Sequence, residues 1–145
     1  MIAVDTNILV YANRGEYPFH QAAQAAIGEL AASGRRWAVP WPCVHEFIAI
    51  VTNARIHRPA TTVAMAMTFI NNIRAVSSCE FIGEGEGYFE IFRDLAAASH
   101  VCGGQIHDCR IAAIAIHHGA SELWTADRDF SRFPRLKTRN PLIKK

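Results

Sequence analysis

The sequence predicts an α/β fold, a three-layer α/β/α sandwich with a short, mainly parallel β-sheet. Short apolar runs of strand type alternate with longer segments whose apolar residues recur at helical spacing. No hairpin signal joins two strand-type runs, so successive strands must be connected through helices, which makes them parallel. A chain of 145 residues suits a single domain spanning residues 1–145.

The first third of the chain predicts two strands and two helices. A β-type run at residues 1–4 ends in Asp5 and Thr6, which are both good N-caps for the apolar-periodic segment that follows. Residues 13–18 read as a turn. The Ala-rich segment 19–32 has helical spacing and is closed by Ser33 and Gly34. A short strand at residues 37–39 is stopped by Pro40.

The middle of the chain predicts three helices and a weak strand. Pro42 suits the first turn of a helix that runs to about residue 53. After a loop at 55–59, a helix at 61–76 carries Met65, Phe69 and Ile73 at helical spacing, and a weak strand follows at 80–82. A Gly/Glu loop at 83–87 leads into a helix at 88–98. Its residues Phe89, Phe92 and Leu95 are expected to point inward.

The segment from Ile106 to Phe130 organises the rest of the chain. It predicts a helix, a Gly-marked turn, a strand at 123–125 and an acidic turn, before a last edge strand at 135–138. After Arg110 the helix is almost wholly apolar, so it should be buried. Asp108 lies near its start, and a carboxylate on the inner side of a buried helix is costly unless a cation meets it.

Four acidic positions share a setting that favours a metal site. Asp5 and Asp127 each follow a strand, and the carboxyl ends of parallel strands meet at one edge of a sheet. Asp108 lies near a helix N-terminus at that edge, and Glu46 lies on an otherwise apolar helix. Carboxylates drawn together repel one another unless they hold a hard cation, and Mg²⁺ and Mn²⁺ prefer oxygen ligands.

Each acidic residue also has an ordinary structural interpretation. Asp5 can be a helix N-cap, Asp127 and Asp129 can be turn residues, Glu46 can pair with an arginine, and Asp108 can cap its helix. Nucleophilic enzymes are less favoured, because the chain has neither a G-x-S-x-G elbow nor a Walker phosphate loop. His107 and Cys109 are too close in sequence to face each other on a helix.

Composition limits the class of protein further. The net charge is only +2, but seven of the fifteen Lys and Arg residues fall between Arg128 and Lys145, a patch that attracts phosphate unless it is only a solvated tail. The four cysteines are scattered and predict free thiols. No apolar run approaches the roughly 18 residues of a membrane span, and the N-terminus lacks a basic start, so a cytoplasmic protein is expected.

Four segments carry a resemblance to a known family. The segments VDTNILVY at Val4–Tyr11, HEF at His45–Phe47, DCRIAAIA at Asp108–Ala115 and TADRDF at Thr125–Phe130 resemble the motifs of the PIN-domain nucleases. The first and last motifs are fairly specific, and the Glu motif is much less so. Chain length and motif order resemble in particular the VapC-type toxins of prokaryotic toxin–antitoxin pairs.

The resemblance implies a function and a set of residues. It implies a Mg²⁺- or Mn²⁺-dependent endoribonuclease that acts as a homodimer and is inhibited by a VapB-type antitoxin. The acidic quartet of the family corresponds to Asp5, Glu46, Asp108 and Asp127 as catalytic and metal-binding residues, with Asp129 as a further candidate ligand. Thr6 and Thr125 match positions that orient the carboxylates or a bound water. The family often has a small residue where this chain has Cys109.

Arg128 and Arg132 are the candidates for steering the RNA backbone. Two alternatives to the nuclease stay open on the sequence. One is a catalytically silent PIN-like module that binds RNA or protein. The other is a metal-dependent phosphohydrolase acting on DNA or small phosphate esters.

Overall fold

The computed structural model describes residues 1–143, so Lys144 and Lys145 of the basic segment lie outside the described residues. It contains a five-stranded sheet in the order β3-β2-β1-β4-β5, and every neighbouring pair of strands is parallel. The strands are β1 (Ile2–Val4), β2 (Trp37–Pro40), β3 (Cys79–Ile82), β4 (Glu122–Trp124) and β5 (Lys137–Arg139).

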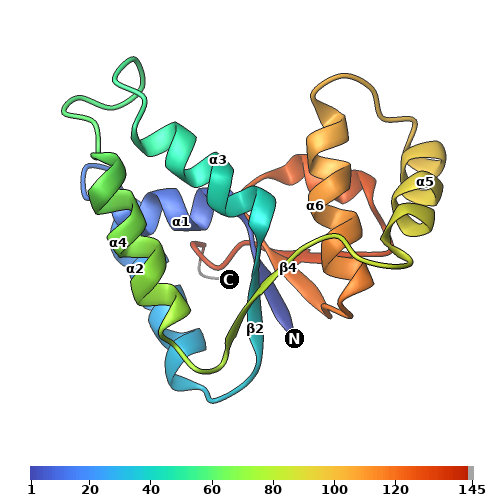
Figure 1. Ribbon diagram of the computed structural model, residues 1–145, viewed down its shortest axis with the longest axis horizontal. Coiled ribbons are helices and arrows are strands. Elements are labelled where there is room, and N and C mark those ends of the chain that lie inside the picture. The colour runs from blue at the N-terminus through green and yellow to red at the C-terminus, as the bar shows by residue number, and fades with distance from the viewer. Residues whose placement is uncertain (144–145) are drawn as a thin grey trace.

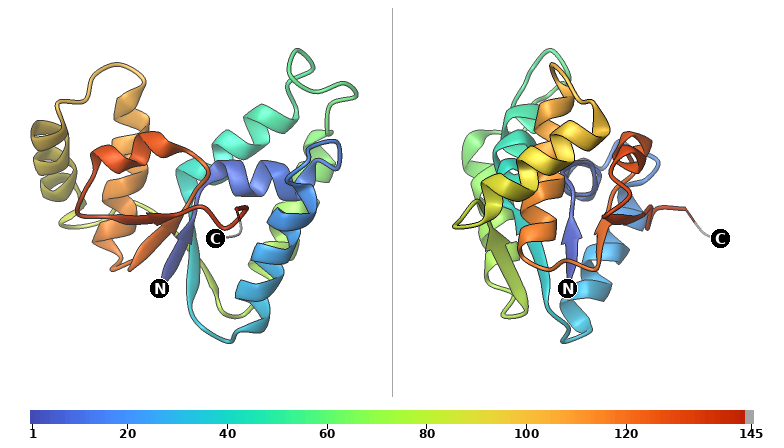
Figure 2. Two further views of the ribbon diagram at one scale, coloured as in Figure 1. Left: turned by 180° about the vertical axis from the view of Figure 1, so that it is seen from behind. Right: turned by 90° about the vertical axis from the view of Figure 1, so that its right-hand side faces the viewer.

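Helices lie on both sides of this sheet (Figure 1, Figure 2). One side carries α1 (Thr6–Asn13), α2 (His20–Ala32), α3 (Trp41–Val51) and α4 (Val63–Arg74). The other side carries α5 (Tyr88–Ser99), α6 (Gln105–His117) and the short 3₁₀-helix η1 (Arg128–Arg132). The predicted three-layer α/β fold with a parallel sheet is therefore confirmed.

The order of the strands explains why the helices divide between two faces. From β1 the chain moves outward to β2 and β3, and then it returns across the sheet to β4, which pairs with the other edge of β1. Right-handed crossovers in opposite directions place their helices on opposite faces. A crevice therefore opens at the carboxyl ends of β1 and β4, where the connections that follow the two paired strands leave toward opposite faces of the sheet. Ligands bind at this position in open α/β sheets.

The core lies on both faces of the sheet and includes the middle of α6. Its residues from Ile111 to Ala115 are all buried, as its apolar run predicts. Ile114 is fully buried against Ala38 of β2 and Ile82 of β3. The helix ends at a left-handed glycine, Gly119, whose backbone N–H donates to the carbonyl of Ile116, so the Gly-marked turn is also confirmed.

One predicted helix face is wrong in part. Phe89 is 60% exposed, because α5 packs mainly against α6 and buries the face that contains Leu95. The predicted helical spacing of α4 is confirmed, and its buried face contains Ala66, Ile70 and Ile73, while Met65 is 62% exposed. The periodicity of both helices was correct, but apolar residues on either side of the buried stripe made its direction ambiguous.

Smaller differences concern the ends of elements. Thr125 follows β4 instead of ending it, the last strand is Lys137–Arg139, and η1 has no counterpart in the expected elements. The four cysteines are free, as expected. None of the helices formed by residues 1–143 combines the length and the hydropathy that crossing a bilayer requires.

Packing of α6 on the sheet generates a stability prediction. Replacing Ile114 with alanine should lower the free energy of unfolding by about 3 kcal/mol, since it leaves a cavity between α6, β2 and β3. The matched control is Ile56→Ala, because Ile56 is 55% exposed and its truncation should change stability by less than about 0.5 kcal/mol. Urea unfolding measures both, and equal losses would contradict this account of the core.

Candidate functional site

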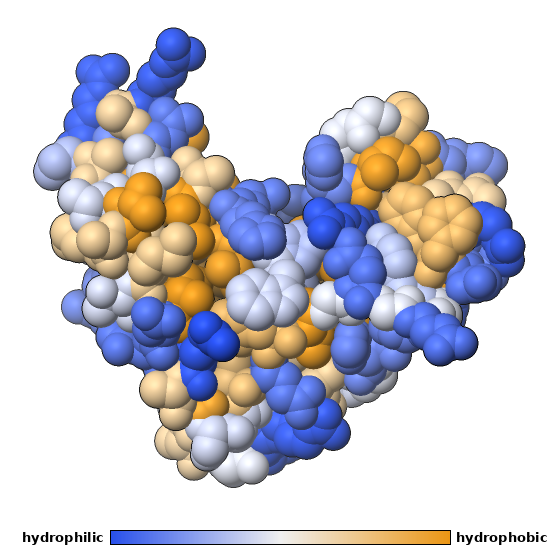
Figure 3. Space-filling view, viewed as in Figure 1, coloured by the Kyte–Doolittle hydropathy of each residue, from blue (hydrophilic) through white to orange (hydrophobic). Residues whose placement is uncertain are grey.

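The four predicted acidic residues line one cleft at the crevice between β1 and β4. Asp5 follows β1, Glu46 comes from α3, Asp108 from α6, and Asp127 lies just after β4. The cleft has a volume of about 180 Å³ and lies between α1 and α3 on one side and α6 on the other. Figure 3 shows the surface hollowed between these two groups of helices, with hydrophilic residues at the base.

Asp5 forms the buried end of the cleft and accepts hydrogen bonds from several elements. Its Oδ1 accepts from the backbone N–H of Thr6 at 2.8 Å and from the Cys43 thiol at 3.6 Å. Its Oδ2 accepts from the Thr125 hydroxyl at 2.7 Å and from the Asn7 amide at 3.1 Å. Asp5 is therefore the N-cap of α1, as its ordinary interpretation predicts, and it also faces the cleft.

Burial dominates the electrostatics of Asp5. Only 4% of the residue is exposed, and desolvation raises its pKa from 3.8 to about 6, with the charge of Glu46 adding to the rise. The hydrogen bonds from Thr125 and Thr6 act in the opposite direction, because they stabilise the ionised form. The pKa of Asp5 that results from these opposing effects is therefore about 6.

A second group of carboxylates lies across the cleft. Asp108, Asp127 and Asp129 each offer an oxygen atom, and these atoms lie within 4.8 Å of one another. Asp127 is the N-cap of η1, since its Oδ1 accepts from the Asp129 backbone N–H at 2.9 Å. Asp129, expected only as a further candidate ligand, therefore lies with this pair of aspartates in one cluster of oxygen atoms.

Burial raises the pKa of Asp108, and the negative charge of neighbouring carboxylates adds to the rise. Desolvation is the largest cause, followed by the charges of Asp127, Glu46 and Asp129, while Arg132 has a lowering effect. The alternative that Asp108 caps its helix is wrong, because the N-cap of α6 is Gly104. Among residues 1–143, Glu46 forms no ion pair with an arginine, so that alternative also finds no support.

Asn7 is a central residue of the site for which the sequence predicted no role, although it belongs to the VDTNILVY segment. Its amide N–H₂ donates to Asp5 and to the hydroxyl of Thr125, at 3.1 Å each, and its Oδ1 accepts from the backbone N–H of Ala126 at 3.0 Å. It therefore ties the start of α1 to the segment after β4. The sequence feature that could have identified it is its position two residues after Asp5, in the first turn of the helix that follows the first strand.

The two predicted orienting threonines differ in their contacts. Thr125 Oγ1 donates to Asp5 and accepts from the backbone N–H of Asp127 at 3.0 Å, so it contacts both carboxylate residues. Thr6 contacts Asp5 through its backbone, and its buried hydroxyl has no hydrogen-bond partner among the residues described. Thr6 also lines the cleft, and its hydroxyl lies near enough to the Cys43 thiol to oppose the rise that burial causes in the pKa of that thiol.

The two predicted basic residues belong to η1. Arg128 is exposed and follows Asp127 directly. Arg132 is held within η1, because its Nε donates to the Asp129 carbonyl at 2.9 Å and its Nη2 lies 3.9 Å from the Asp129 carboxylate. Cys109 points away from the cleft into the core, where its thiol is fully buried, which argues against a nucleophilic role.

The donor set fits a hard divalent cation. The carboxylate oxygens of Asp108, Asp127 and Asp129 converge within 4.8 Å, and Asp5 and Glu46 line the same cleft as Asp108 and Asp127. Oxygen-only ligands suit Mg²⁺ or Mn²⁺ and do not suit zinc, which prefers nitrogen and sulfur. A cation would also relieve the repulsion that raises the pKa of Asp108.

Comparisons with known proteins agree with this geometry. The PIN domain family matches residues 2–136. Ribonuclease VapC43 of Mycobacterium tuberculosis is 33% identical over 142 residues, which cover 98% of this chain and 96% of that protein. Ribonuclease VapC48 of the same organism is 25% identical and covers 94% of each chain. The solved structure of VapBC2 from Rickettsia felis bound to a promoter DNA fragment shares the fold, with a TM-score of 0.71, 21% identity and coverage of 97% and 98%.

The raised pKa of Asp5 generates a prediction for the cation-free protein. In the unfolded chain this pKa returns to 3.8, so between 3.8 and about 6 the folded state binds more protons. The stability contributed by protonated Asp5 is present below pH 3.8 and is lost as the pH rises through about 6, which amounts to about 2–3 kcal/mol.

Urea unfolding in EDTA at a series of pH values measures this loss. Asp5→Asn should remove that part of the pH dependence, whereas Asp94→Asn, which changes an exposed aspartate on α5, should retain it. Equal pH dependence in wild type and Asp5→Asn would contradict the prediction.

Proposed function

This chain belongs to the PIN domain family, and from that premise we propose that it is a metal-dependent endoribonuclease, the toxin component of a VapBC-type toxin–antitoxin pair. The observation that carries the proposal is the convergence of Asp5, Glu46, Asp108 and Asp127, from four distant segments, on one cleft. Relatives that match nearly the full length of the chain bear the name ribonuclease VapC, which supports RNA as the substrate.

The carboxylates supply the binding site for the cation. We assign Asp108, Asp127 and Asp129 as the residues that would hold Mg²⁺ or Mn²⁺, with Asp5 and Glu46 completing the acidic cleft. When bound, such a cation supplies activation of a water for in-line attack on phosphorus and neutralisation of charge on the scissile phosphate. A bound cation would lower the pKa of Asp108, which burial and the charges of neighbouring carboxylates raise in the cation-free cleft.

The remaining residues position these groups. Thr125 and Asn7 hold Asp5 in one orientation through hydrogen bonds of 2.7 and 3.1 Å, so its carboxylate does not need to reorganise during the reaction. Asp127 is held by its own hydrogen bond to the start of η1. Arg128, exposed beside the acids, contributes positive charge that attracts the RNA backbone.

The proposed partners follow from the same relatives. A VapB-type antitoxin is the proposed inhibitor, because the solved structures that share this fold include VapBC2 from Rickettsia felis and VapBC-1 from nontypeable Haemophilus influenzae. An antitoxin segment that occupies the acidic cleft would exclude RNA from it. We further propose that the protein acts as a homodimer in the cytoplasm.

Cleavage of a total RNA pool tests the proposed function. The purified protein, free of antitoxin, should make discrete cuts in the presence of Mg²⁺ or Mn²⁺ and none in EDTA. Asp5→Asn/Asp108→Asn should lower the rate by about a hundred-fold or more, because it removes ligands that control charge at the reacting phosphate. The exposed-residue control Asp94→Asn should cut normally.

DNA and nucleotide substrates, tested in parallel, distinguish a ribonuclease from the alternative of a metal-dependent phosphohydrolase that acts on DNA or small phosphate esters. Folded protein that binds RNA without any metal-dependent cleavage would instead indicate a silent binding module, and the nuclease proposal would then be rejected.

The role of Arg128 generates a separate prediction. Arg128→Ala should weaken RNA binding and reduce the slope of log affinity against log salt by about 0.7, which corresponds to one lost phosphate contact on a single strand. The matched control is Arg93→Ala, on the outer helix α5 and paired with Asp94. Fluorescence anisotropy at several salt concentrations measures both, and an unchanged affinity and slope for Arg128→Ala would remove this residue from the RNA site.

A further inference from the structure

The wall of the cleft opposite α6 includes a tyrosine that the proposed reaction does not use. Tyr17, in the turn between α1 and α2, is half-buried and lines the cleft together with the acidic residues. Its ring packs edge-on against Tyr11, another residue of this wall, with 5.0 Å between the ring centroids. Tyr17 is therefore placed where a substrate bound at the carboxylates would pass.

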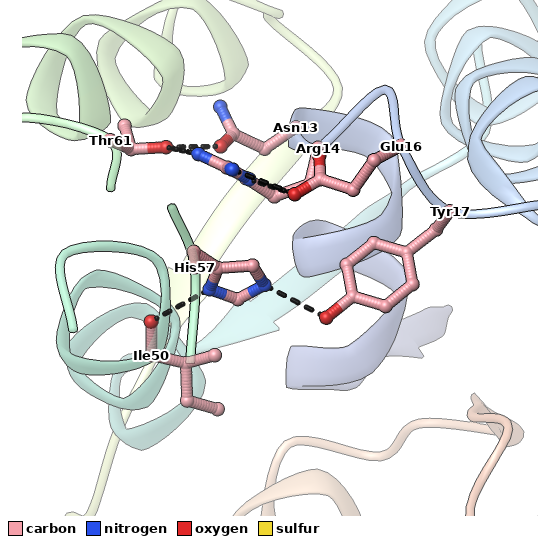
Figure 4. Close-up of polar contacts among 7 residues, drawn as sticks. All are labelled: Asn13, Arg14, Glu16, Tyr17, Ile50, His57 and Thr61. Atoms are coloured by element: carbon pink, nitrogen blue, oxygen red, sulfur yellow. Dashed lines mark hydrogen bonds and ion pairs between the residues drawn. The ribbon is translucent and has the colours of Figure 1, made fainter. Parts of the chain in front are cut away.

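A buried histidine determines how the Tyr17 hydroxyl is oriented. His57 is 3% exposed, and its Nδ1 lies 3.1 Å from the carbonyl oxygen of Ile50 while its Nε2 lies 2.8 Å from the Tyr17 hydroxyl (Figure 4). A carbonyl oxygen can only accept, so Nδ1 of the neutral imidazole carries the proton. Nε2 is then the acceptor, and the Tyr17 hydroxyl must donate its proton to it.

A second network fixes the same turn to the loop after α3. The Arg14 guanidinium donates to the Thr61 hydroxyl at 3.0 Å and to the Glu16 carboxylate at 2.7 Å, and Thr61 donates to Asn13 Oδ1 at 3.2 Å (Figure 4). Tyr17 therefore lies on a turn that is held on both sides, by Arg14 and by His57. A polar group held in this way is preorganised for a ligand, because little orientational freedom remains to be lost on binding.

A hydroxyl whose proton is committed to an imidazole can only accept a further hydrogen bond. Phosphate oxygens also only accept, so they are not its partners. Among the groups of a polynucleotide that donate, the ribose 2′-hydroxyl lies closest to the phosphorus and is present on every nucleotide of RNA and on none of DNA.

We propose that Tyr17, oriented by His57, accepts a hydrogen bond from a 2′-hydroxyl beside the scissile phosphate and thereby selects RNA over DNA. This inference rests on the proposed ribonuclease function. Tyr17 is a specificity-determining residue in this scheme, and His57 is a positioning residue.

The test is a double-mutant cycle that removes the Tyr17 hydroxyl from the protein and one 2′-hydroxyl from the substrate. Wild type and Tyr17→Phe are compared on a short RNA that spans a mapped cut site, and on versions with a single 2′-deoxynucleotide at each flanking position, at about pH 8, where imidazoles are neutral. At one position the deoxy substitution should lower the wild-type kcat/KM by about three- to ten-fold, the value of one hydrogen bond. Tyr17→Phe should lose a similar factor on the all-ribose RNA and show no further loss at that position.

Two further variants separate positioning from folding. Tyr88→Phe, which removes the hydroxyl of a half-buried tyrosine on α5 outside the cleft, should keep the full 2′-deoxy penalty. His57→Gln should retain part of the penalty, and a full penalty in this variant would overturn the orienting role of His57. Repeating the comparison as binding, by anisotropy in the non-cleaving Asp108→Asn background, reports the contact without the chemistry.

The possible failures have different signatures. If the loss from Tyr17→Phe and the loss from a 2′-deoxy substitution multiply at every position, the two groups act independently. That result would reject the proposed contact and leave the nuclease function intact. Absence of RNA cleavage by the wild type would instead reject the proposed function. If Tyr17→Phe keeps the penalty while Tyr17→Leu loses it, the ring and not the hydroxyl makes the contact, and the proposal is wrong.

Discussion

The carboxylate of Asp5 connects the elements that form the cleft, and the rest of the site depends on its position. It accepts hydrogen bonds from α1, from α3 and from the segment after β4. Burial disfavours its ionised form and the hydrogen-bond donors favour it, and the pKa that results from both is about 6. The donors therefore both stabilise the charge and determine how the three elements meet, which couples the geometry of the fold to the chemistry of the site.

The part of this arrangement that follows strand topology could be predicted from the sequence. The carboxyl ends of parallel strands lie at the same edge of a sheet. The residues that follow β1 and β4 were therefore expected to lie close together once both segments were recognised as strands. Asp108 could be identified because a charged residue stands out at the start of an otherwise apolar helix. The fold class and nearly all elements were correct for the same reason, since alternating strand and helix periodicities leave few topologies.

The contacts that could not be predicted join residues far apart in the chain. Asn7 reaches Thr125 across 118 residues, and Tyr17 reaches His57 across 40. No local pattern distinguishes such residues from surface polar groups, because the partner is known only after the elements are placed in space. Phe89 shows the converse error, since a large apolar residue at helical spacing was assigned to the core although α5 packs on one side only.

On the proposed function, the same negative charge that binds the cation also controls access to the cleft. RNA is a polyanion, and Asp108, Asp127, Asp129 and Glu46 repel it as long as no cation is bound. The cation is then a condition for substrate binding as well as for chemistry. Selectivity for the sugar must in that case come from uncharged groups, because charge alone cannot distinguish the phosphates of RNA from those of DNA. In the scheme proposed above, the Tyr17 hydroxyl is such a group on the wall opposite α6, and the buried imidazole of His57 orients it from behind.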